Sequence, residues 1–365
     1  MNRRRIDLVV VLPTGNRGGA EKIALGLARR VASDGANVLV MLLTKDSQGI
    51  REEFALLGST VSVADGFFSN ARLGYVLGLA RVVWLSALNR VGVVFSTHAH
   101  VNAMLGFLRR GRLLSCSRLV ARESTLIFER FGGLKRAIMS ALYHAGYGTQ
   151  DLLVSQTREM KESLEKWVPQ CLPKRHLVIA NPYWGSLEHA RSVDCERAEC
   201  RIVACGRLHP IKRFEELIRA VAEVRSHGHS FVLEVIGDGP SRPDLVRLVR
   251  DLGVCEFVRF RGYCPRPVEV MAGASIGVVT SALEGFPNVV LDMMAAGVRR
   301  IISTPCAPAL ERIPGLAITK GFGSTDIARQ IEVEYASGVD DSKQYRQYLL
   351  EHHSPERFVG EVMGK

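Results

Sequence analysis

Short runs of apolar residues alternate with amphipathic segments along nearly the whole chain. Continuous apolar runs are typical of parallel strands buried on both faces, and the segments between them have helical periodicity. The alternation therefore predicts an α/β protein built from βα units. The predicted strands are Leu8–Leu12, Val38–Leu43, Val91–Phe95, Arg118–Ala121, Leu152–Ser155, Leu177–Ile179, Ile202–Cys205, Val232–Ile236, Val258–Phe260, Ile276–Thr280 and Arg300–Ser303. The predicted helices include Glu21–Ala32, Phe214–His227, Arg242–Leu252 and Val290–Ala296.

One polar, aperiodic stretch, Tyr183–Arg201, interrupts this alternation. Because 365 residues suffice for two domains, we predict two doubly wound, Rossmann-like parallel-sheet domains facing each other across a cleft. The expected segments are a first domain over 1–183, a linker over 184–200, a second domain over 201–341 and a C-terminal helix over 342–365, which could pack back on the first domain. The cleft would collect the carboxyl ends of the strands, where open α/β sheets bind ligands.

The net charge of +11 is concentrated in the first half of the chain. Residues 1–183 contain 25 Lys and Arg against 13 Asp and Glu, whereas residues 184–365 contain 23 against 24. An anionic partner should therefore meet the first domain. No aromatic and basic pattern for base stacking accompanies the charge, which disfavours nucleic acid. Eight cysteines without a CxxC spacing indicate reduced thiols in the cytoplasm, and no segment predicts a membrane-spanning helix.

A glycine-rich loop, Pro13–Glu21, follows the first predicted strand and opens a helix. Gly15, Gly18 and Gly19 permit close approach of an anion to the helix N-terminus. The spacing is neither GxGxxG nor that of a P-loop, which disfavours nicotinamide and ATP binding. A merely structural turn remains an alternative for this loop.

Four loops of the second half contain candidate anion-binding residues. Arg207 and Lys212, after one strand, can clamp a diphosphate through a planar fork and a point charge. The Gly-Asp-Gly of 237–239 and the Phe-Arg-Gly of 260–262 follow the next two strands. The segment Thr280–Asp292, with the sequence TSALEGFPNVVLD, ends another strand and begins a helix whose first amides could face an anion.

These motifs, in this order, resemble the nucleotide-sugar-binding half of the family 4 glycosyltransferases of the GT-B fold, of the kind that builds bacterial cell-surface polysaccharides. In the first half, the GGAEK of 18–22 and the IANP of 179–182 look like that family's start and crossover. The resemblance covers essentially the whole chain. It implies a retaining transferase, of the hexosyl or N-acetylhexosaminyl class, that uses a nucleotide-diphosphate sugar, with UDP favoured over GDP.

The resemblance also implies roles for individual residues. Arg207 and Lys212 would bind the donor diphosphate, Glu284 would hold the hydroxyls of the donor sugar, and Asp292, where the family has Glu, would contact the ribose. The wider expected donor set is Gly18, Gly19, Gly206, Gly237, Gly239, Gly285, Phe286, Pro287, Asn288, Val289 and Asp292. In this reading residues 1–183 bind the acceptor and 201–341 the nucleotide sugar.

Four residues after predicted strands of the first half are candidates for the acceptor side. His100 would touch the donor sugar or acceptor and take part in catalysis, and His98, Arg122 and Glu123 would lie on the same edge. The alternatives are structural or solvated histidines and a surface ion pair.

We expect no cofactor and no metal, because no two Asp residues have the DxD spacing that holds a metal-bound diphosphate. Two other functions stay open. One is a nucleotide-sugar epimerase or hydrolase of the same fold. The other is an inactive sugar-nucleotide-binding subunit, suggested by Asp292 and by Arg213 where Gly commonly follows the Lys.

The segment Val101–Leu114 places Arg109, Arg110 and Arg112 beside apolar residues, as in helices that lie in an anionic membrane interface. A helix packed in the first core is the alternative. With the basic first half, this pattern favours a lipid-linked saccharide acceptor at an anionic membrane surface. It predicts peripheral association with the inner face of the cytoplasmic membrane, in synthesis of lipopolysaccharide, O-antigen or capsule.

Overall fold

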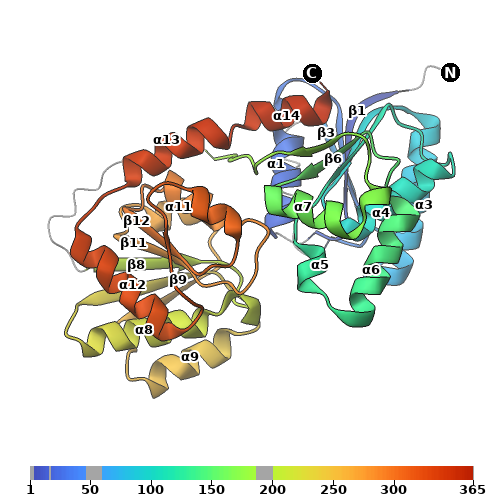
Figure 1. Ribbon diagram of the computed structural model, residues 1–365. Helices are drawn as coiled ribbons and strands as arrows, with labels where there is room; N and C mark the ends of the chain where they lie inside the picture. Colours follow the sequence, from blue (N-terminus) through green and yellow to red (C-terminus); the bar gives the residue numbers. More distant parts are fainter. Residues whose placement is uncertain (1–3, 16–17, 47–59, 186–199, 365) are drawn as a thin grey trace. The chain divides into compact units, whose positions relative to one another are not determined.

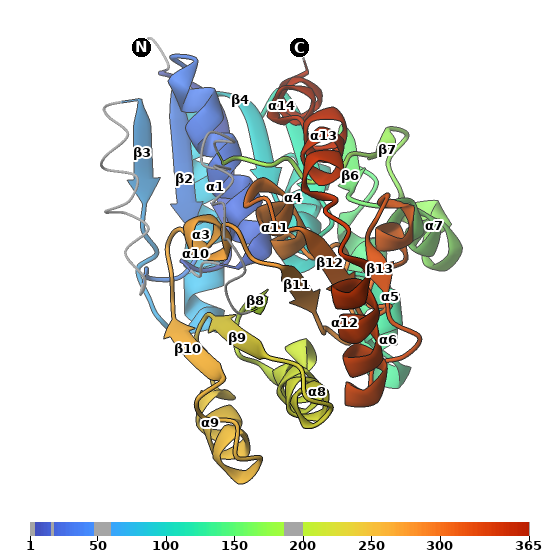
Figure 2. The same cartoon turned by 90° about the vertical axis from the view of Figure 1, so that its left-hand side faces the viewer.

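The computed structural model describes residues 4–15, 18–46, 60–185 and 200–364. The chain divides into two compact units: Met1–Trp184 together with Pro355–Lys365, and the contiguous Gly185–Ser354. Figures 1 and 2 show that each unit is a twisted sheet flanked by helices. Most of the predicted linker, residues 186–199, lies outside the described residues.

The first unit has a seven-stranded, fully parallel sheet in the order β3-β2-β1-β4-β5-β6-β7. Its strands are β1 (Arg5–Leu12), β2 (Val38–Leu42), β3 (Val61–Ala64), β4 (Arg90–Ser96), β5 (Arg118–Arg122), β6 (Leu152–Ser155) and β7 (His176–Val178). Its helices are α1 (Gly19–Ser33), α3 (Ala71–Leu88), α4 (Ala99–Arg110), α5 (Ile127–Arg130), α6 (Gly133–Gly146), α7 (Arg158–Trp167), η1 (Pro169–Cys171) and α14 (Pro355–Met363).

Alternate residues of the central strands supply the two cores of this unit. Val10 of β1 faces the core under α1 and α14, whereas Val9 and Val11 face the core under α3 and α4. All three are nearly inaccessible to solvent, which explains why the strand is a continuous apolar run. Figure 1 shows α1 and α14 on one side of the sheet and α3, α4 and α6 on the other.

The second unit has a six-stranded parallel sheet in the order β10-β9-β8-β11-β12-β13. Its strands are β8 (Cys200–Cys205), β9 (Phe231–Ile236), β10 (Val258–Gly262), β11 (Ile276–Val279), β12 (Arg300–Ser303) and β13 (Ala317–Ile318). Its helices are η2 (Pro210–Lys212), α8 (Phe214–Ser226), α9 (Arg242–Asp251), α10 (Pro267–Met271), α11 (Val289–Ala295), η3 (Pro308–Arg312), α12 (Ser324–Ser337) and α13 (Ser342–His352).

The predicted fold class, two doubly wound parallel-sheet domains, is confirmed, and all eleven predicted strands are present with ends that shift by at most three residues. Two edge strands were not predicted: β3 is short and half-exposed, and β13 has only two residues. The single helix predicted over 342–365 is divided into α13 and α14, because Pro355 cannot continue a helix. None of the described helices is both long and apolar enough to cross a membrane.

Candidate functional site

Both sheets reverse their strand order beside their first strand. In the first unit β1 lies between β2 and β4, and in the second unit β8 lies between β9 and β11. The carboxyl end of the strands at such a reversal is where open α/β sheets bind ligands. Most of the predicted site residues lie on the loops that leave β1, β4, β8 and β11. The topology therefore collects them into one group in each unit.

In the second unit, the loop after β8 is fastened to the loop after β9. The Gly206 amide donates to the Ile236 carbonyl at 2.9 Å, and further backbone bonds join the two loops beyond it. Gly237 and Gly239 have φ values of 135° and 159°. A Cβ on Gly237 would collide with the Gly206 carbonyl, and one on Gly239 with the Leu208 carbonyl. These two glycines thus let the β9 loop pack closely on the β8 loop. From the sequence we expected both in the donor-binding set.

Lys212 and Glu284, predicted for the diphosphate and the sugar, are brought together as an ion pair. Lys212 Nζ lies 2.5 Å from Glu284 Oε1, and each side chain is about one quarter exposed. Two bonds hold their loops in place: Thr280 Oγ1 donates to the Lys212 carbonyl at 2.6 Å, and the Ala282 amide donates to the Ile211 carbonyl at 2.8 Å. The carboxyl ends of β8 and β11 thus hold opposite charges in contact, both reachable from solvent.

Arg207 lies on the same β8 loop and is exposed. Within the described parts of the chain its guanidinium has no ion-pair or hydrogen-bond partner. An exposed, planar guanidinium on the same loop as Lys212 can donate two hydrogen bonds to the oxygens of a phosphate. The next basic residue, Arg213, instead donates to the Phe322 carbonyl and pairs with Glu216, so it belongs to the scaffold.

The segment after β11 runs from Glu284 into α11. The Glu284 amide donates to the Cys306 carbonyl at 2.9 Å, and the Phe286 ring packs on His353 with centroids 5.5 Å apart. Asp292 is half-buried in the first turn of α11, and its amide donates to the Asn288 carbonyl at 3.3 Å. The predicted loop residues follow one another here: Gly285, Phe286, Pro287, Asn288 and Val289.

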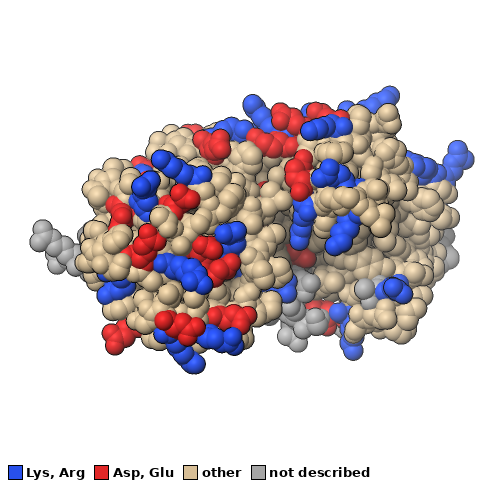
Figure 3. Space-filling model, turned by 60° about the horizontal axis from the view of Figure 1, so that its bottom comes forward, with Lys and Arg blue, Asp and Glu red and all other residues tan. Residues whose placement is uncertain are grey.

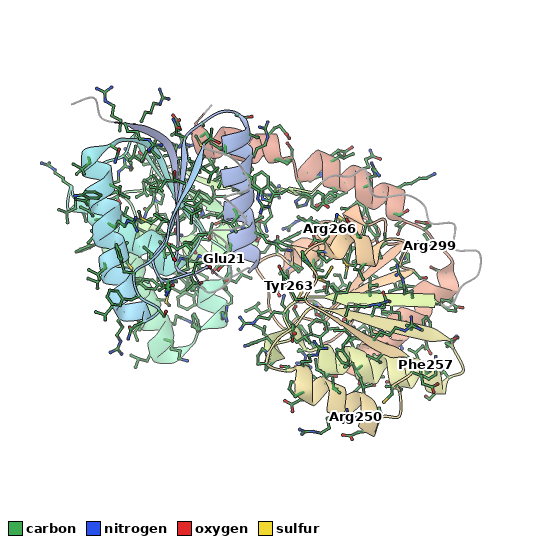
Figure 4. The ribbon with its side chains drawn as sticks, turned by 180° about the vertical axis from the view of Figure 1, so that it is seen from behind. Glu21, Arg250, Phe257, Tyr263, Arg266 and Arg299 are labelled. Carbon is green, nitrogen blue, oxygen red and sulfur yellow. The ribbon has the colours of Figure 1, made fainter. Side chains whose placement is uncertain are left out.

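In the first unit, Gly18 and Gly19 begin α1 and both are exposed. Residues 16 and 17 of the same loop lie outside the described residues. Glu21, labelled on α1 in Figure 4, is only 6% exposed. Its Oε1 lies 3.3 Å from Nε2 of His98, at the N-terminus of α4. The loop after β1 and the loop after β4 therefore meet through a carboxylate and an imidazole.

His100 continues this contact along the first turn of α4. Its ring lies 5.9 Å from the His98 ring, and its Nε2 is 2.8 Å from the Tyr75 hydroxyl of α3. Burial, with a smaller contribution from the charge of His98, lowers the pKa of His100 to about 4. His100 is therefore a neutral imidazole near pH 7, able both to donate and to accept a hydrogen bond.

Arg122 and Glu123 do not form the acceptor-side surface that we expected. Both are 1% exposed. Glu123 accepts hydrogen bonds from the hydroxyls of Tyr143 and Tyr147, and burial raises the pKa of its carboxyl group. Arg122 donates to Asn181 and Gln156, and burial lowers its pKa to about 10. The pair links α6, β5 and the segment after β7 inside the unit, so its role is structural.

The segment Val101–Leu114 also differs from the expected membrane-interface helix. Val101 and Leu105 are completely buried, so this face of α4 packs in the core. Arg109 pairs with Asp151 at 2.6 Å, and Arg110 donates to carbonyls at the end of α6. The helix therefore uses its apolar face and two of its three arginines within the protein.

Two residues of the first-unit group were not singled out in the sequence. Glu21 belongs to the GGAEK string, but only the strand order shows that His98 lies beside it. Tyr75 lies in a helix without an amphipathic period, because apolar residues line both its buried and its exposed side.

Comparison with known proteins agrees with this architecture. Residues 199–333 match the family model described as "Glycosyl transferases group 1". The protein EpsF of Bacillus subtilis is 24% identical over 319 residues, which cover 83% of this chain and 80% of EpsF.

Two further relatives match over shorter stretches. The lipopolysaccharide core biosynthesis glycosyltransferase LpsD of Rhizobium meliloti is 33% identical over 108 residues, 30% of each chain. A Campylobacter jejuni N-acetylgalactosaminyltransferase, named for its N-acetylgalactosamine-N,N'-diacetylbacillosaminyl-diphospho-undecaprenol acceptor, is 31% identical over 94 residues, covering 26% of this chain and 25% of that protein.

Among solved structures, that of Anabaena Alr3699/HepE in complex with UDP-glucose superposes with a TM-score of 0.77. It covers 98% of both chains at 17% identity, which is evidence for a shared fold. The family match over the second unit, the relative that spans most of the chain and the full-length fold match agree with the motif order in the sequence. On these findings the chain has the GT-B fold, and its second unit is similar to the group 1 glycosyltransferases.

Proposed function

We propose that the protein is a retaining transferase that moves a hexosyl or N-acetylhexosaminyl group from a nucleotide-diphosphate sugar, with UDP favoured, to a lipid-linked saccharide. The observation that carries the proposal is the Lys212–Glu284 pair at the switch point of the second sheet, with exposed Arg207 on the same loop as Lys212. Cations for a diphosphate and a carboxylate for sugar hydroxyls lie within one small group of loops. UDP-glucose bound by the structurally similar Anabaena protein supports the choice of UDP.

The charges fit the chemistry of this transfer. As the glycosidic bond breaks, negative charge gathers on the diphosphate that leaves. Arg207 and Lys212 would hold fixed positive charge at that position, and such preorganised charge stabilises a transition state more than the ground state. Glu284 would orient the donor sugar through its hydroxyls. We favour front-side, substrate-assisted attack, in which the acceptor enters on the face of the departing diphosphate and no covalent enzyme intermediate forms.

The remaining donor contacts come from α11 and its preceding loop. Asp292 would hold the ribose, and the loop over 284–289 would surround the phosphates. Arg207 and Lys212 supply the cations, so we propose that transfer needs no bound metal. In the first unit, neutral His100 would contact the sugar or acceptor, and His98, held by Glu21, would lie beside it.

The proposed acceptor is a saccharide on a lipid carrier, in lipopolysaccharide, O-antigen or capsule synthesis. The Rhizobium relative acts in lipopolysaccharide core synthesis by name, and the Campylobacter relative is named for an undecaprenol-linked acceptor. The basic first half of the chain suits an anionic carrier and a place at the inner face of the cytoplasmic membrane.

A thermal-shift screen against UDP- and GDP-sugars tests the donor half of the proposal. A ligand that binds only the folded chain raises stability by about 2.7 kcal/mol at a concentration 100 times its Kd. We expect one UDP-sugar to raise the melting temperature and Arg207→Ala to abolish the rise. Arg247→Ala, which removes an exposed arginine of α9, is the matched control.

The same screen, followed by transfer assays, separates the alternatives. Turnover of the bound donor without acceptor would favour an epimerase or hydrolase. Binding without turnover on any lipid-linked or free saccharide would favour an inactive binding subunit. If no nucleotide sugar shifts the melting temperature, the proposed donor class is wrong.

A further inference from the structure

Helix α3 is apolar on both sides: Val82, Leu79 and Leu85 pack in the core of the first unit, while other large apolar residues face outward. Its buried side carries Gly74 and Gly78, where a Cβ would press on the Leu43 backbone at about 3 Å, followed by buried Ser86. The opposite side is an unbroken apolar stripe at helical spacing, exposed by 40–67% per residue. We name it the α3 stripe; it consists of Leu73, Val76, Leu77, Trp84 and Leu88. A helix on a water-exposed surface normally carries polar residues on its outer side, so this stripe requires an explanation.

Other elements of the first unit also expose large apolar residues. Phe67 and Phe68, in the loop before α3, are exposed, and Arg81 of α3 lies over the Phe67 ring at 5.2 Å. On helix α6, which packs against α4 on the same sheet face, Leu134 and Ile138 are also exposed. Large apolar side chains therefore extend over several elements of one face of the unit.

The charged residues of helices α3, α4 and α6 are all basic. Between Asp65 and Glu123 the chain has eight arginines and no Asp, Glu or Lys, a stretch that includes all of α3 and α4. Helix α6 adds Lys135 and Arg136 and again no acidic residue. The helices on the other face, α1 and α14, carry acidic and basic residues together. Figure 3 shows the usual mixture over the second unit, on the left, where blue and red side chains are interspersed.

The stripe also adjoins the first-unit group of site residues. Helix α3 begins at the carboxyl end of the sheet, and Tyr75, between Leu73 and Val76, is the residue that contacts His100. The first turns of α3, which carry Leu73 and Val76, are therefore linked to the first-unit group through Tyr75. A lipid-linked substrate could reach this edge while its lipid stayed outside the protein.

We infer that the α3 stripe lies in the interfacial region of an anionic lipid bilayer. This inference rests on the proposed function, since it gives the surface that would bring the first unit to a lipid-linked acceptor, and it replaces α4 with α3 as that surface. The exposed apolar side chains can insert between lipids, Trp84 suits the headgroup boundary, and the basic residues of α3, α4 and α6 attract anionic lipid. A protein partner with a neutral apolar groove would use the stripe but would have no need of the basic residues around it.

Vesicle co-sedimentation of the full chain tests the inference. Vesicles of phosphatidylcholine with an equal part of phosphatidylglycerol should bind at least ten-fold more tightly than pure phosphatidylcholine, with affinity falling as salt rises. The triple variant Val76→Ser, Leu77→Ser, Trp84→Ser should lose at least ten-fold in affinity. The matched control Val333→Ser, Val339→Ser, Leu350→Ser removes exposed apolar residues of the second unit and should bind as the wild type does.

Tryptophan fluorescence gives a second readout that does not depend on the triple variant folding. Brominated acyl chains in the anionic vesicles should quench part of the wild-type emission, and Trp84→Phe should remove that part. The inference is wrong if anionic vesicles bind no better than neutral ones, if the two triple variants bind equally, or if quenching persists in Trp84→Phe. A wild-type dimer in analytical ultracentrifugation that the α3 triple variant turns into a monomer would identify the stripe as a contact between copies instead.

These measurements use no nucleotide sugar, so they separate the inference from the proposed function. Vesicle binding through the stripe with no donor binding in the thermal-shift screen would overturn the proposed function alone. Donor binding with no vesicle binding would overturn the membrane surface alone.

Discussion

Lys212 and Glu284 form an ion pair of 2.5 Å across the loops that leave β8 and β11. Because both groups are partly exposed, such a pair contributes little stability and opens at small cost. A donor that offered a diphosphate to Lys212 and hydroxyls to Glu284 would give each group a new partner. The pair is thus compatible with a site that is ordered before the donor arrives.

Removal of the positive charge of Arg207 or of Lys212 should impair transfer without unfolding the protein. We expect Arg207→Ala and Lys212→Ala each to lower kcat/KM at least ten-fold, a loss of about 1.4 kcal/mol of transition-state stabilisation. Arg247→Ala, on exposed α9, should keep wild-type kinetics. Wild-type rates in both Arg207→Ala and Lys212→Ala would remove the diphosphate assignment.

Chelation should leave the enzyme active. The chain has no Asp pair at DxD spacing, and cationic side chains can neutralise the diphosphate in place of Mg²⁺. Initial rates with and without EDTA should agree within two-fold, as roughly expected when no metal participates. Loss of activity in EDTA that Mg²⁺ or Mn²⁺ restores would contradict this prediction.

Asp292 should matter for binding of the nucleotide more than for the folded state. If its carboxylate holds the ribose, Asp292→Ala should weaken UDP binding by about ten-fold, equivalent to one charge-assisted hydrogen bond, and Asp292→Glu should be tolerated. Isothermal titration calorimetry with UDP measures the affinity of both variants. Equal affinity in wild type and Asp292→Ala would show that the ribose is held elsewhere.

Arg213 has a backbone conformation that glycine would adopt without strain. Its φ of 50° and ψ of 40° lie in the left-handed region, which costs a side-chain-bearing residue about 1 kcal/mol. Arg213→Gly should therefore be more stable to urea than Arg213→Ala by about 1 kcal/mol, since both lose the same guanidinium contacts. At exposed Arg219, inside α8, Arg219→Gly should instead be less stable than Arg219→Ala, because glycine is disfavoured within a helix.

Acid should destabilise the protein partly through His100. Its pKa is about 4 when folded and about 6.5 when unfolded, so between these values the unfolded chain binds more protons and stability falls as the pH falls. Because the ring is partly exposed, solvent weakens this effect, and we expect the free energy of unfolding to fall by about 2 kcal/mol from pH 7 to pH 4. Urea titrations should show a smaller loss in His100→Gln. His176, with a pKa also near 4 through burial and nearby Lys161, should behave similarly.

The strands and the second-unit loops could be predicted from the sequence because their signals are local. Each central strand is a short apolar run, and Arg207, Lys212 and Glu284 come directly after such runs. The contact between Lys212 and Glu284 was not predicted as an ion pair, since it depends on β8 and β11 being neighbours although 70 residues separate them.

The features that the sequence did not predict correctly also have physical causes. Helix α3 has no amphipathic period because apolar residues line both its buried and its exposed side, so its exposed apolar stripe could not be distinguished from a core segment. Arg122 and Glu123 follow a strand, as site residues do, but Tyr143 and Tyr147 of α6 enclose the carboxylate. Strand-end position identifies candidates, whereas burial by elements distant in sequence decides whether they can meet a ligand.

Helix α14 changes the order in which the two units can be completed during synthesis. Phe358 is fully buried in the first unit, where its ring meets Phe95 edge-on, and Val362 is buried beside it. A ribosome makes these residues only after it has made the whole of the second unit. The unit that is translated first therefore exposes part of its core until the second has left the ribosome, and the second, being contiguous, can fold earlier.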